Sequence, residues 1–388
     1  MYHIHCLNKI SPKGTALLTD NYAITDDRNQ ADGVLVRSAD MHNVALPESL
    51  LAVARAGAGV NNIPLSDCAE AGVVVFNTPG ANANAVKELT VCALLLASRD
   101  VVGGADWVKL QAGAGADVAA AVEKGKSQFV GPELMGKTLG VIGLGAIGVQ
   151  VANIATKLGM TVYGYDPFLS VDAALSLSRF VHRAMDLETI YKNCDYITLH
   201  VPQTPETRGM INTDAINMMK GHVRILNLAR GGLVNDDDML AALETGRVAA
   251  YVTDFPNNKI VQGKRVVAIP HLGASSPESE ENCAVMAAQE LKDYLENGNI
   301  RNAVNLPNLV QDWSGETRLC IIHRNVPNML ASVTTVLSRE HVNVENMTNK
   351  SRGEYAYTIV DVSARVGDAV ANELRAIDGI LRVRVLNH

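Results

Sequence analysis

The sequence predicts an α/β protein with two doubly wound parallel-sheet domains and a smaller C-terminal βαββαβ domain. Three observations support this prediction. Short β-like runs alternate with Ala-rich helical stretches through the first hundred residues, and a sharper strand–helix alternation begins at Lys137. A glycine-rich turn at 143–148 joins a predicted strand to a predicted helix. Residues 317–388 follow the order of a ferredoxin-like domain.

The N-terminal region contains the first strand–helix units. Gly33–Val36 and Val73–Phe76 are short apolar runs typical of strands, and Ala85–Ser98 has the composition of a helix. Because these runs alternate along the chain, they predict the first of the two parallel sheets.

A Gly/Ala-rich stretch follows this first region. Val102–Ala121 predicts a helix that is interrupted at Gly103-Gly104 and at Gly113, since glycine weakens helices. A loop-like segment at 125–136 comes next, and the pattern changes after it.

The remaining elements are predicted from apolar runs and their spacing. In the central region we expect strands at 138–142, 161–165, 196–200, 223–228 and 249–254, and helices at 146–158 and 277–297. Residues 305–316 contain Pro, Asn and Gly without periodicity, which is typical of a linker. Beyond it we expect strands at 318–323, 342–349, 354–363 and 381–386, and helices at 327–340 and 368–376.

Composition excludes several classes of protein. The 388 residues carry 34 Lys and Arg against 41 Asp and Glu, a net charge of −7, so nucleic acid is not an expected partner. The longest apolar run, Val91–Ala97, is far shorter than the roughly 20 residues that cross a membrane. Six cysteines without close pairs predict neither a disulfide framework nor a metal site. We expect a cytoplasmic protein without a membrane partner.

The glycine-rich turn predicts a dinucleotide site of the Rossmann type. Its residues are Gly143-Leu144-Gly145-Ala146-Ile147-Gly148, and Asp166 ends the next predicted strand. The first glycine permits a tight turn, the second allows a pyrophosphate to approach the backbone, and the third lets helix and strand pack closely. The carboxylate of Asp166 accepts hydrogen bonds from ribose hydroxyls and repels a 2′-phosphate, which favours NAD over NADP. The alternative is a purely structural glycine turn.

Further segments resemble a known family. With the glycine turn, they make essentially the whole chain similar to the D-isomer-specific 2-hydroxyacid dehydrogenases, and among them to those that oxidise phosphoglycerate. The segments occur in the same order along the chain: Val53–Asn62 (VARAGAGVNN), Phe76–Glu88 (FNTPGANANAVKE), His200–Thr207 (HVPQTPET), Asn227–Asn235 (NLARGGLVN) and Pro270–Ser275 (PHLGAS).

The resemblance implies a division into domains. A substrate-binding domain is expected from residues 1–98 and 276–306, with an NAD-binding domain at 99–275 inserted between them. A linker at 307–316 and a regulatory domain at 317–388 complete the chain. Substrate is expected in the cleft between the first two domains. A homodimer is expected through the NAD-binding domain, and pairing of the C-terminal domains into a tetramer is left open.

The resemblance also implies catalytic residues. Oxidation of a 2-hydroxy acid needs a base for the hydroxyl proton and a cation for the carboxylate. His271 matches the acid/base histidine of the family, Arg230 matches the arginine that holds the carboxylate, and Asp254 matches the aspartate that contacts the nicotinamide carboxamide. The other implied cofactor contacts are His200, Val201, Pro202, Thr207, Ala229, His271, Gly273 and Ala274.

One position departs from the family. A glutamate that pairs with the catalytic histidine follows the aspartate in a pattern like DVFxxEP, whereas residues 254–260 read DFPNNKI and residues 255–277 contain no acid. Such a partner orients the imidazole, so its loss should reduce the rate without removing the base. We expect Asn257, Asn258 or a carboxylate from Glu278 onward to replace it.

A phosphorylated substrate requires a second cationic cluster, because a desolvated phosphate must be neutralised. The family's phosphoglycerate enzymes use an Arg-Ser pair after the second predicted strand and an asparagine in the loop before the long helix. The substrate-binding candidates beside Arg230 and His271 are Arg37, Ser38, Arg55, Gly57, Gly59 and Asn82.

The C-terminal residues resemble an ACT domain, a small amino-acid-sensing module. His323-Arg324-Asn325-Val326-Pro327-Asn328 matches its His-x-Asn-x-Pro-Gly loop, with Asn328 in place of glycine. Asparagine tolerates positive φ better than most residues, so the turn should be kept. The resemblance implies that L-serine binds at His323, Asn325 and Asn343 and inhibits the enzyme. A purely oligomerising domain is the alternative.

Together these features imply NAD-dependent oxidation of D-3-phosphoglycerate to 3-phosphohydroxypyruvate, the first step of phosphorylated serine biosynthesis. Two alternatives stay open. One is another D-2-hydroxyacid dehydrogenase, such as a glyoxylate or hydroxypyruvate reductase. The other is a non-catalytic NAD(H)-sensing protein, which the missing glutamate motivates.

Overall fold

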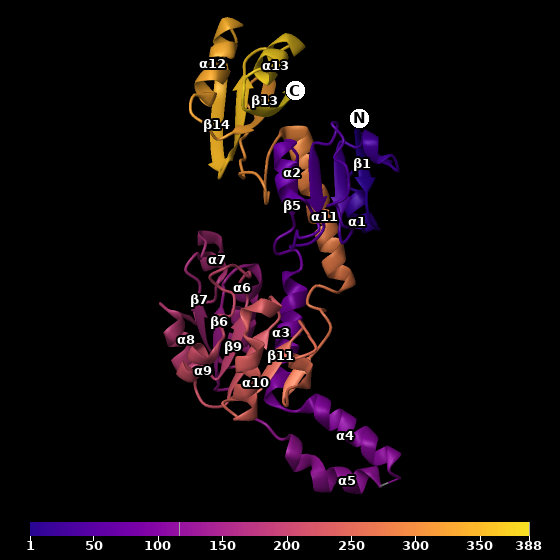
Figure 1. Ribbon diagram of the computed structural model, residues 1–388, viewed down its shortest axis with the longest axis vertical. Coiled ribbons are helices and arrows are strands. Elements are labelled where there is room, and N and C mark those ends of the chain that lie inside the picture. Colours follow the sequence, from indigo (N-terminus) through magenta and orange to yellow (C-terminus); the bar gives the residue numbers. More distant parts are fainter. Residues whose placement is uncertain (116, 388) are drawn as a thin grey trace. The chain divides into compact units, whose positions relative to one another are not determined.

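The chain folds into two compact units, each built around a parallel sheet (Figure 1). The computed structural model describes residues 1–115 and 117–387. The first unit combines Met1–Ala81 with Glu280–His388, and the second contains Asn82–Ser279. Both sheets consist of parallel strands, and helices occur in most of the connections between them, which confirms the predicted α/β class.

The second unit contains a seven-stranded parallel sheet with the order β12-β11-β10-β9-β6-β7-β8. The strand order reverses between β6 and β9, which are hydrogen-bonded neighbours although two strands separate them in the sequence. The strands are β6 (Thr138–Ile142), β7 (Thr161–Tyr165), β8 (Val181–Arg183), β9 (Tyr196–Leu199), β10 (Val223–Asn227), β11 (Val248–Thr253) and β12 (Val266–Ala268).

Helices bury both faces of this sheet. Successive residues of β10 point to opposite faces, so that Ile225 joins one buried cluster and Leu226 the other. This arrangement confirms the predicted doubly wound sheet. The helices of the whole second unit, of which α4 and α5 contribute no buried residue, are α3 (Ala83–Ser98), α4 (Val101–Gly113), α5 (Val118–Gly125), α6 (Ala146–Lys157), α7 (Val171–Ser176), α8 (Leu187–Asn193), α9 (Thr213–Met218) and α10 (Asp236–Glu244).

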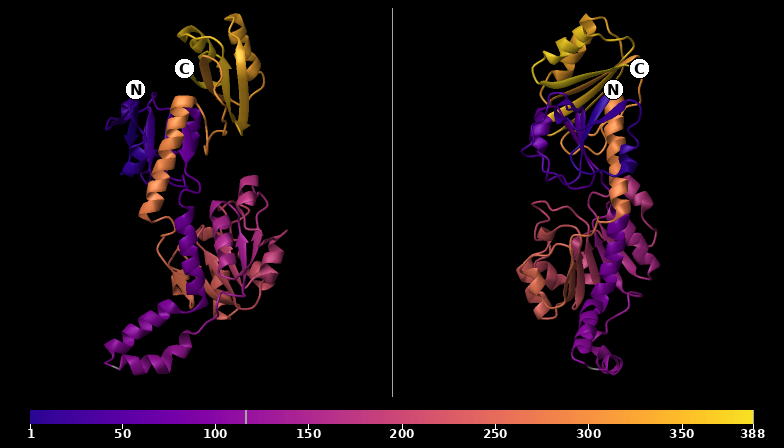
Figure 2. Two further views of the ribbon diagram at one scale, coloured as in Figure 1. Left: turned by 180° about the vertical axis from the view of Figure 1, so that it is seen from behind. Right: turned by 90° about the vertical axis from the view of Figure 1, so that its right-hand side faces the viewer.

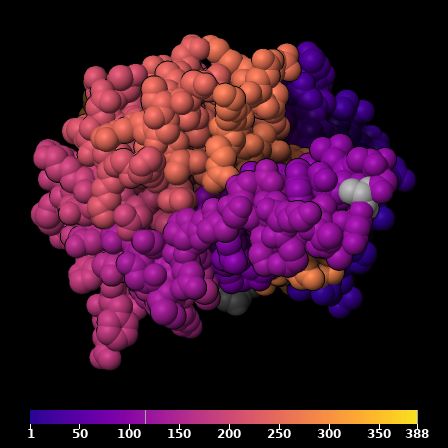
Figure 3. Space-filling view, turned by 90° about the horizontal axis from the view of Figure 1, so that it is seen from below, coloured from indigo at the N-terminus to yellow at the C-terminus, as the bar shows by residue number. Residues whose placement is uncertain are grey.

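Helices α4 and α5 form a hairpin on the second unit, and one expectation about it is wrong. Gly103-Gly104 does not interrupt the helix, because α4 runs from Val101 to Gly113. The two helices of the hairpin can be followed in Figure 2. The carboxylate of Asp100 caps the helix by accepting a hydrogen bond from the backbone N–H of Gly103 at 3.1 Å. Such a cap offsets the cost of a glycine near the start of a helix. Figure 3 shows the outer surface of this hairpin.

The first unit contains a five-stranded parallel sheet with the order β2-β1-β3-β4-β5. The long helix α11 (Pro277–Asn297) packs Ala287, Leu291 and Leu295 into the cluster on one face. The other elements are β1 (Tyr2–Cys6), α1 (Pro12–Thr15), β2 (Tyr22–Thr25), β3 (Gly33–Val36), β4 (Ala52–Arg55), α2 (Leu65–Glu70) and β5 (Val74–Asn77).

The C-terminal residues form an antiparallel sheet with the order β14-β15-β13-β16. Two helices cover one face, and the other face packs into the core that contains α11, since Cys320, Ile322 and Tyr357 belong to that cluster. The predicted βαββαβ order is confirmed by β13 (Thr317–Arg324), α12 (Met329–Arg339), β14 (Val344–Arg352), β15 (Tyr355–Val362), α13 (Asp368–Arg375) and β16 (Ile380–Asn387).

Buried arginines of the C-terminal sheet cap the end of α11. Arg384 donates from its two Nη groups to the backbone oxygens of Tyr294 and Leu295, at 2.9 and 2.7 Å. Arg318 donates from Nη1 to the oxygen of Asn297 at 2.8 Å. The last carbonyls of a helix lack partners within it and carry partial negative charge, so guanidinium groups stabilise them. No helix in the described residues has both the length and the apolar character to cross a bilayer.

The Arg318–Asp361 ion pair predicts a stability effect. Both side chains are fully buried, and Nε and Nη2 of Arg318 donate to the two carboxylate oxygens at 2.7 and 2.8 Å. Asp361→Asn leaves a buried charge uncompensated, so we expect the free energy of unfolding to fall by about 3–5 kcal/mol. Denaturant titration measures it.

Glu188→Gln is the control, because it breaks an exposed ion pair with Lys192 that contributes at most about 1 kcal/mol. Equal unfolding midpoints for the two variants would contradict a structural role for the buried pair.

Candidate active site

The candidate catalytic and cofactor residues of the second unit follow the carboxyl ends of its strands. Because the strands are parallel, these ends meet at one edge of the sheet, where ligands bind in open α/β folds. The residues that follow β6, β7, β9, β10, β11 and β12 include Gly143, Asp166, His200, Arg230, Asp254 and His271, in that order.

The glycine turn after β6 is shaped by close contacts. Gly143 has a φ of +93°, and a Cβ there would lie 2.5 Å from the backbone oxygen of His200. A Cβ at Gly148 would lie 1.9 Å from the oxygen of Gly143, so the start of α6 packs directly on the turn. By contrast, a Cβ at Gly145 would meet no atom within 4 Å. The turn therefore leaves open space at its middle glycine.

Three features fit NAD. The space at Gly145 lies at the N-terminus of α6, where no side chain caps the helix, and a pyrophosphate is stabilised by such a helix end. Asp166 is held beside the turn, because its Oδ2 accepts a hydrogen bond from the N–H of Leu144 at 2.8 Å. The third feature is a buried acceptor, Oδ1 of Asp254, which lacks a partner among the described residues and suits a carboxamide donor.

Asp254 is fully buried at the end of β11. Its Oδ2 accepts a hydrogen bond from the N–H of Gly273 at 3.3 Å, which ties β11 to the loop of His271. Burial raises the pKa of Asp254, while the positive charge of His271 opposes that shift. The carboxylate of Asp254 therefore interacts electrostatically with the imidazole.

His271 is exposed and packs against Phe255, with ring centroids 4.7 Å apart. Among the described residues its ring nitrogens form no hydrogen bond or ion pair. Asn257 does not serve as its partner, because the amide of Asn257 donates to Asp236 at 2.8 Å and accepts from the N–H of Ile260 at 2.9 Å. Our expectation for Asn257 is therefore not supported.

Arg230 is exposed on a loop that a buried asparagine holds. The Nδ2 group of Asn227, at the end of β10, donates to the backbone oxygen of Arg230 at 2.9 Å. Its Oδ1 accepts from the N–H groups of Ala229 and Arg230 at 3.3 and 3.4 Å. The guanidinium group of Arg230 bonds only its neighbouring carbonyl, that of Ala229, at 2.6 Å among the described residues. The loop is thus fixed while its cationic group points to solvent.

The loop after β9 is held by internal hydrogen bonds. Burial lowers the pKa of His200 to about 4, so its imidazole is neutral at physiological pH. Thr207 donates from its hydroxyl to the oxygen of Pro202 at 2.7 Å and accepts from the N–H of Thr204 at 2.8 Å. Thr207 therefore shapes this loop, which also contains Val201.

In the first unit the structure brings Arg37, Ser38, Arg55 and Gly57 together. The Oδ1 atom of Asn8 accepts from the N–H groups of both Arg37 and Ser38 at 3.0 Å. The Nε group of Arg55 donates to the oxygen of Arg37 at 3.1 Å.

Gly57 and Glu280 define the surroundings of these arginines. Gly57 has a φ of +147°, and a Cβ there would lie 1.9 Å from Nη1 of Arg55. Nη2 of Arg37 forms an ion pair with Glu280 at 2.6 Å. Gly59 lies in the same loop as Gly57, whereas Asn82 lies in the second unit, where it precedes α3 without capping it.

The effector candidates differ in exposure. His323 is only 2% exposed, and its Nδ1 and Nε2 lie 2.7 Å from the oxygen of Arg324 and 2.9 Å from the hydroxyl of Thr358. Asn325 and Asn343 are exposed. Asn328 has a φ of +69°, which confirms that it takes the conformation expected where the family has glycine.

The open space at Gly145 predicts a selective effect on cofactor binding. Gly145→Val places a side chain where a pyrophosphate would lie, so we expect the affinity for NADH to fall at least about tenfold without a change in the unfolding midpoint. Calorimetric titration with NADH measures it. Gly367→Val is the matched control, because Gly367 also precedes a helix with open space at its Cβ. Unchanged NADH affinity in Gly145→Val would contradict the assignment.

Comparison with known proteins supports these features. Residues 91–273 match the family model described as D-isomer specific 2-hydroxyacid dehydrogenase, NAD binding domain. A D-3-phosphoglycerate dehydrogenase from Methanocaldococcus jannaschii is 35% identical over 297 residues, which cover 74% of this chain and 54% of that protein. One from Rattus norvegicus is 33% identical over 332 residues, which cover 81% of this chain and 59% of that protein. The chain thus spans little more than half the length of these relatives.

Solved structures share the fold. An NAD+-bound 3-phosphoglycerate dehydrogenase from Entamoeba histolytica is 26% identical with a TM-score of 0.61, and the match covers 79% of this chain and 99% of that one. A glyoxylate reductase from Paecilomyes thermophila, 22% identical, has a TM-score of 0.63 and covers 78% and 98%. Residues 91–273 are therefore similar to the NAD-binding domain of the D-isomer specific 2-hydroxyacid dehydrogenases, and about three quarters of the chain is similar to D-3-phosphoglycerate dehydrogenases.

Proposed function

We propose that this chain is an NAD-dependent dehydrogenase that oxidises D-3-phosphoglycerate to 3-phosphohydroxypyruvate. The observation that carries the proposal is the placement of Arg230, Asp254 and His271 after three neighbouring strands, β10, β11 and β12. These residues supply a cation, a buried carboxylate and a base at one edge of the sheet. The names of the relatives support phosphoglycerate as the substrate.

Each residue has a separate role in the proposed reaction. Bound NAD supplies the hydride acceptor for C2 of the substrate. The imidazole of His271 removes the proton of the C2 hydroxyl, and its exposed ring, whose nitrogens form no hydrogen bond within the described part of the chain, supports this role. The planar guanidinium group of Arg230 binds the substrate carboxylate in two parallel hydrogen bonds. We propose that NAD contacts the residues that the sequence predicts for it, which lie between Gly143 and Ala274.

We assign to Asp254 the electrostatic part of the missing glutamate's role. When His271 takes the proton, it becomes a cation, and the buried carboxylate of Asp254 stabilises that charge. The contact is electrostatic, so it leaves the orientation of the ring to the packing of Phe255. This division explains how a base can act without a hydrogen-bonded carboxylate partner.

Arg37 and Arg55 bind the substrate phosphate in this proposal. Their loops are fixed by Asn8 and by the hydrogen bond between the two arginine residues. Glu280 already pairs with Arg37 on an exposed surface, and such pairs are weak. A phosphate dianion therefore displaces or shares this partner at small cost.

L-serine is the proposed effector of the C-terminal domain. The βαββαβ order and the left-handed turn at Asn328 support an ACT-like module. Exposed Asn325 and Asn343 are available to the ligand, whereas His323 must exchange its contact with Thr358 or with the oxygen of Arg324.

Dimerisation through the NAD-binding domain is the proposed assembly, and exposed apolar residues of α4 such as Val101 and Leu110 support it.

Formation of NADH tests the proposed activity. We expect turnover with D-3-phosphoglycerate at mildly alkaline pH, and kcat/KM at least about a hundredfold above that for D-glycerate or D-lactate. Millimolar L-serine should reduce the rate.

Each contrary outcome identifies an alternative. A preference for unphosphorylated acids would indicate a glyoxylate or hydroxypyruvate reductase. NADH binding without turnover on any hydroxy acid would indicate an NAD(H)-sensing protein. If serine leaves the turnover rate unchanged, the C-terminal domain serves oligomerisation only.

The phosphate assignment predicts a change in selectivity. Arg37→Ala should lower kcat/KM for D-3-phosphoglycerate about 10–100-fold, since a charged hydrogen bond contributes about 1.5–3 kcal/mol. The value for D-glycerate should change little. Lys13→Ala is the matched control, because Lys13 pairs with Glu281 beside the Arg37–Glu280 pair. An equal decrease in kcat/KM with both substrates would show that Arg37 does not bind the phosphate.

A further inference from the structure

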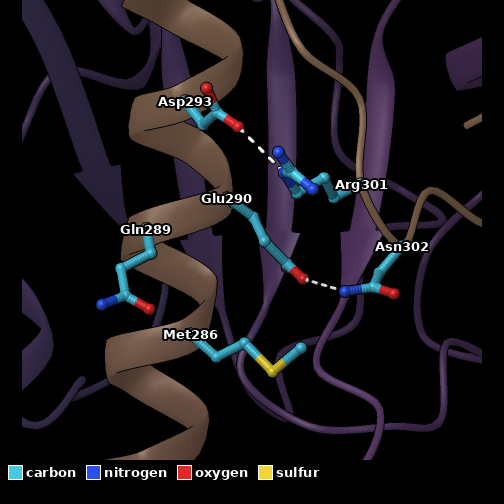
Figure 4. A pocket seen from close by; sticks show the side chains of 6 residues that line it. All are labelled: Met286, Gln289, Glu290, Asp293, Arg301 and Asn302. Atoms are coloured by element: carbon cyan, nitrogen blue, oxygen red, sulfur yellow. Dashed lines mark hydrogen bonds and ion pairs between the residues drawn. The ribbon is translucent and has the colours of Figure 1, made fainter. Parts of the chain in front are cut away.

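A pocket of about 340 Å³ lies in the first unit between α11 and the chain that follows it (Figure 4). An adjoining pocket of about 390 Å³ shares Arg301 and Asn302 and also includes Lys350. These volumes are at the small end of ligand sites. The lining residues of the first pocket are Met286, Gln289, Glu290, Asp293, Arg301 and Asn302.

Glu290 is the unusual group of this pocket. Its side chain is only 6% exposed and extends from α11 toward Asn302 (Figure 4). Its Oε1 accepts a hydrogen bond from Nδ2 of Asn302 at 2.6 Å, but its Oε2 is buried without a partner among the described residues. Burial raises the pKa of this carboxyl to about 8. An unpaired buried carboxylate oxygen is costly, so a donor that compensates it would bind favourably.

The other charged groups around the pocket do not compensate Glu290. Nε of Arg301 pairs with Oδ2 of Asp293 at 3.2 Å. The other oxygen of Asp293 accepts from the side-chain amides of Asn297 and Asn299, at 2.9 and 3.0 Å. Asp293 is therefore fully partnered, and Glu290 is the carboxyl that a ligand can use.

We propose that this pocket binds a small molecule through its primary ammonium group, with Oε2 of Glu290 as the principal acceptor. An ammonium group is a compact cation with three donors, so it matches a single buried carboxylate oxygen. A metal ion fits less well, because no group of three His, Cys, Asp or Glu side chains in the described residues could hold one. The ligand is either a simple amine or a zwitterion whose carboxylate reaches Arg301. The proposal is independent of the dehydrogenase activity.

Asn302 holds the buried carboxyl of Glu290, and charged groups surround it. Asn302 has a φ of +53°, a left-handed conformation that asparagine tolerates, and it directs its amide to Oε1 of Glu290. The charged groups that face Glu290 are Asp293 and Arg301, with Lys350 in the adjoining pocket. The pocket thus combines one unpaired acceptor with cations at its edge.

Titration calorimetry of the full chain with methylammonium chloride tests the proposal. At pH 7 most Glu290 carboxyls are protonated, so binding should release up to one proton, which is measured by comparing buffers with different ionisation enthalpies. The affinity should rise about tenfold from pH 7 to pH 9, as the ionised fraction rises. Glycine and acetate serve as further probes, and we expect glycine to bind and acetate alone not to bind.

Glu290→Gln separates this site from nonspecific binding. The variant keeps the shape of the side chain and removes its charge, so we expect at least about tenfold weaker binding and no proton release. Glu281→Gln on the same helix is the matched control and should bind as the unmodified chain does.

Three outcomes would overturn the proposal: no heat with methylammonium or glycine, equal affinity of the unmodified chain and Glu290→Gln, or binding of acetate alone. The proton release is measured on the unmodified chain, so the test does not depend on the folding of a variant. Dehydrogenase turnover is measured separately, and its absence would not affect this result.

Discussion

The parallel pairing of β6 with β9 is the constraint on which the candidate active site depends. Ile142 lies opposite Leu199, and the N–H of His200 donates to the oxygen of Ile142 at 2.8 Å. The strand order reverses at this pairing, and dinucleotides bind at such a reversal. The close approach leaves no room for a side chain at Gly143, because a Cβ would lie 2.5 Å from the oxygen of His200. The need for glycine at Gly143 is therefore a packing requirement.

Two asparagines solve the same problem in the two units. Arg230 and Arg37, which we propose to bind anions, need side chains that solvent can reach on loops that are ordered. The side chain of Asn227 orders its loop by hydrogen-bonding both the N–H and the backbone oxygen of Arg230. The side chain of Asn8 orders the other loop by accepting a hydrogen bond from the N–H of Arg37. Each net hydrogen bond contributes about 1 kcal/mol, and their larger effect is to fix the loop.

The sequence predicts the regular elements well and the contacts between them poorly. The strands at 138–142 and 161–165 are confirmed at both ends, because buried parallel strands are continuous apolar runs. The helix at 277–297 is also confirmed at both ends. The prediction at Gly103-Gly104 is wrong, since a propensity argument omits the cap from Asp100. Neither the engagement of Asn257 with Asp236 nor the burial of Glu290 could be predicted, because both depend on residues that only the tertiary fold brings near.

Helix α11 connects the regions of the first unit that the proposals concern. Its first turns carry Glu280, which pairs with Arg37, its middle carries Glu290, and its last carbonyls are capped by Arg384. A packed helix moves as a unit rather than by bending, because its backbone hydrogen bonds and buried face resist local change. The Glu280–Arg37 pair, the pocket at Glu290 and the contact with the C-terminal sheet therefore lie at the start, middle and end of one continuous packed helix.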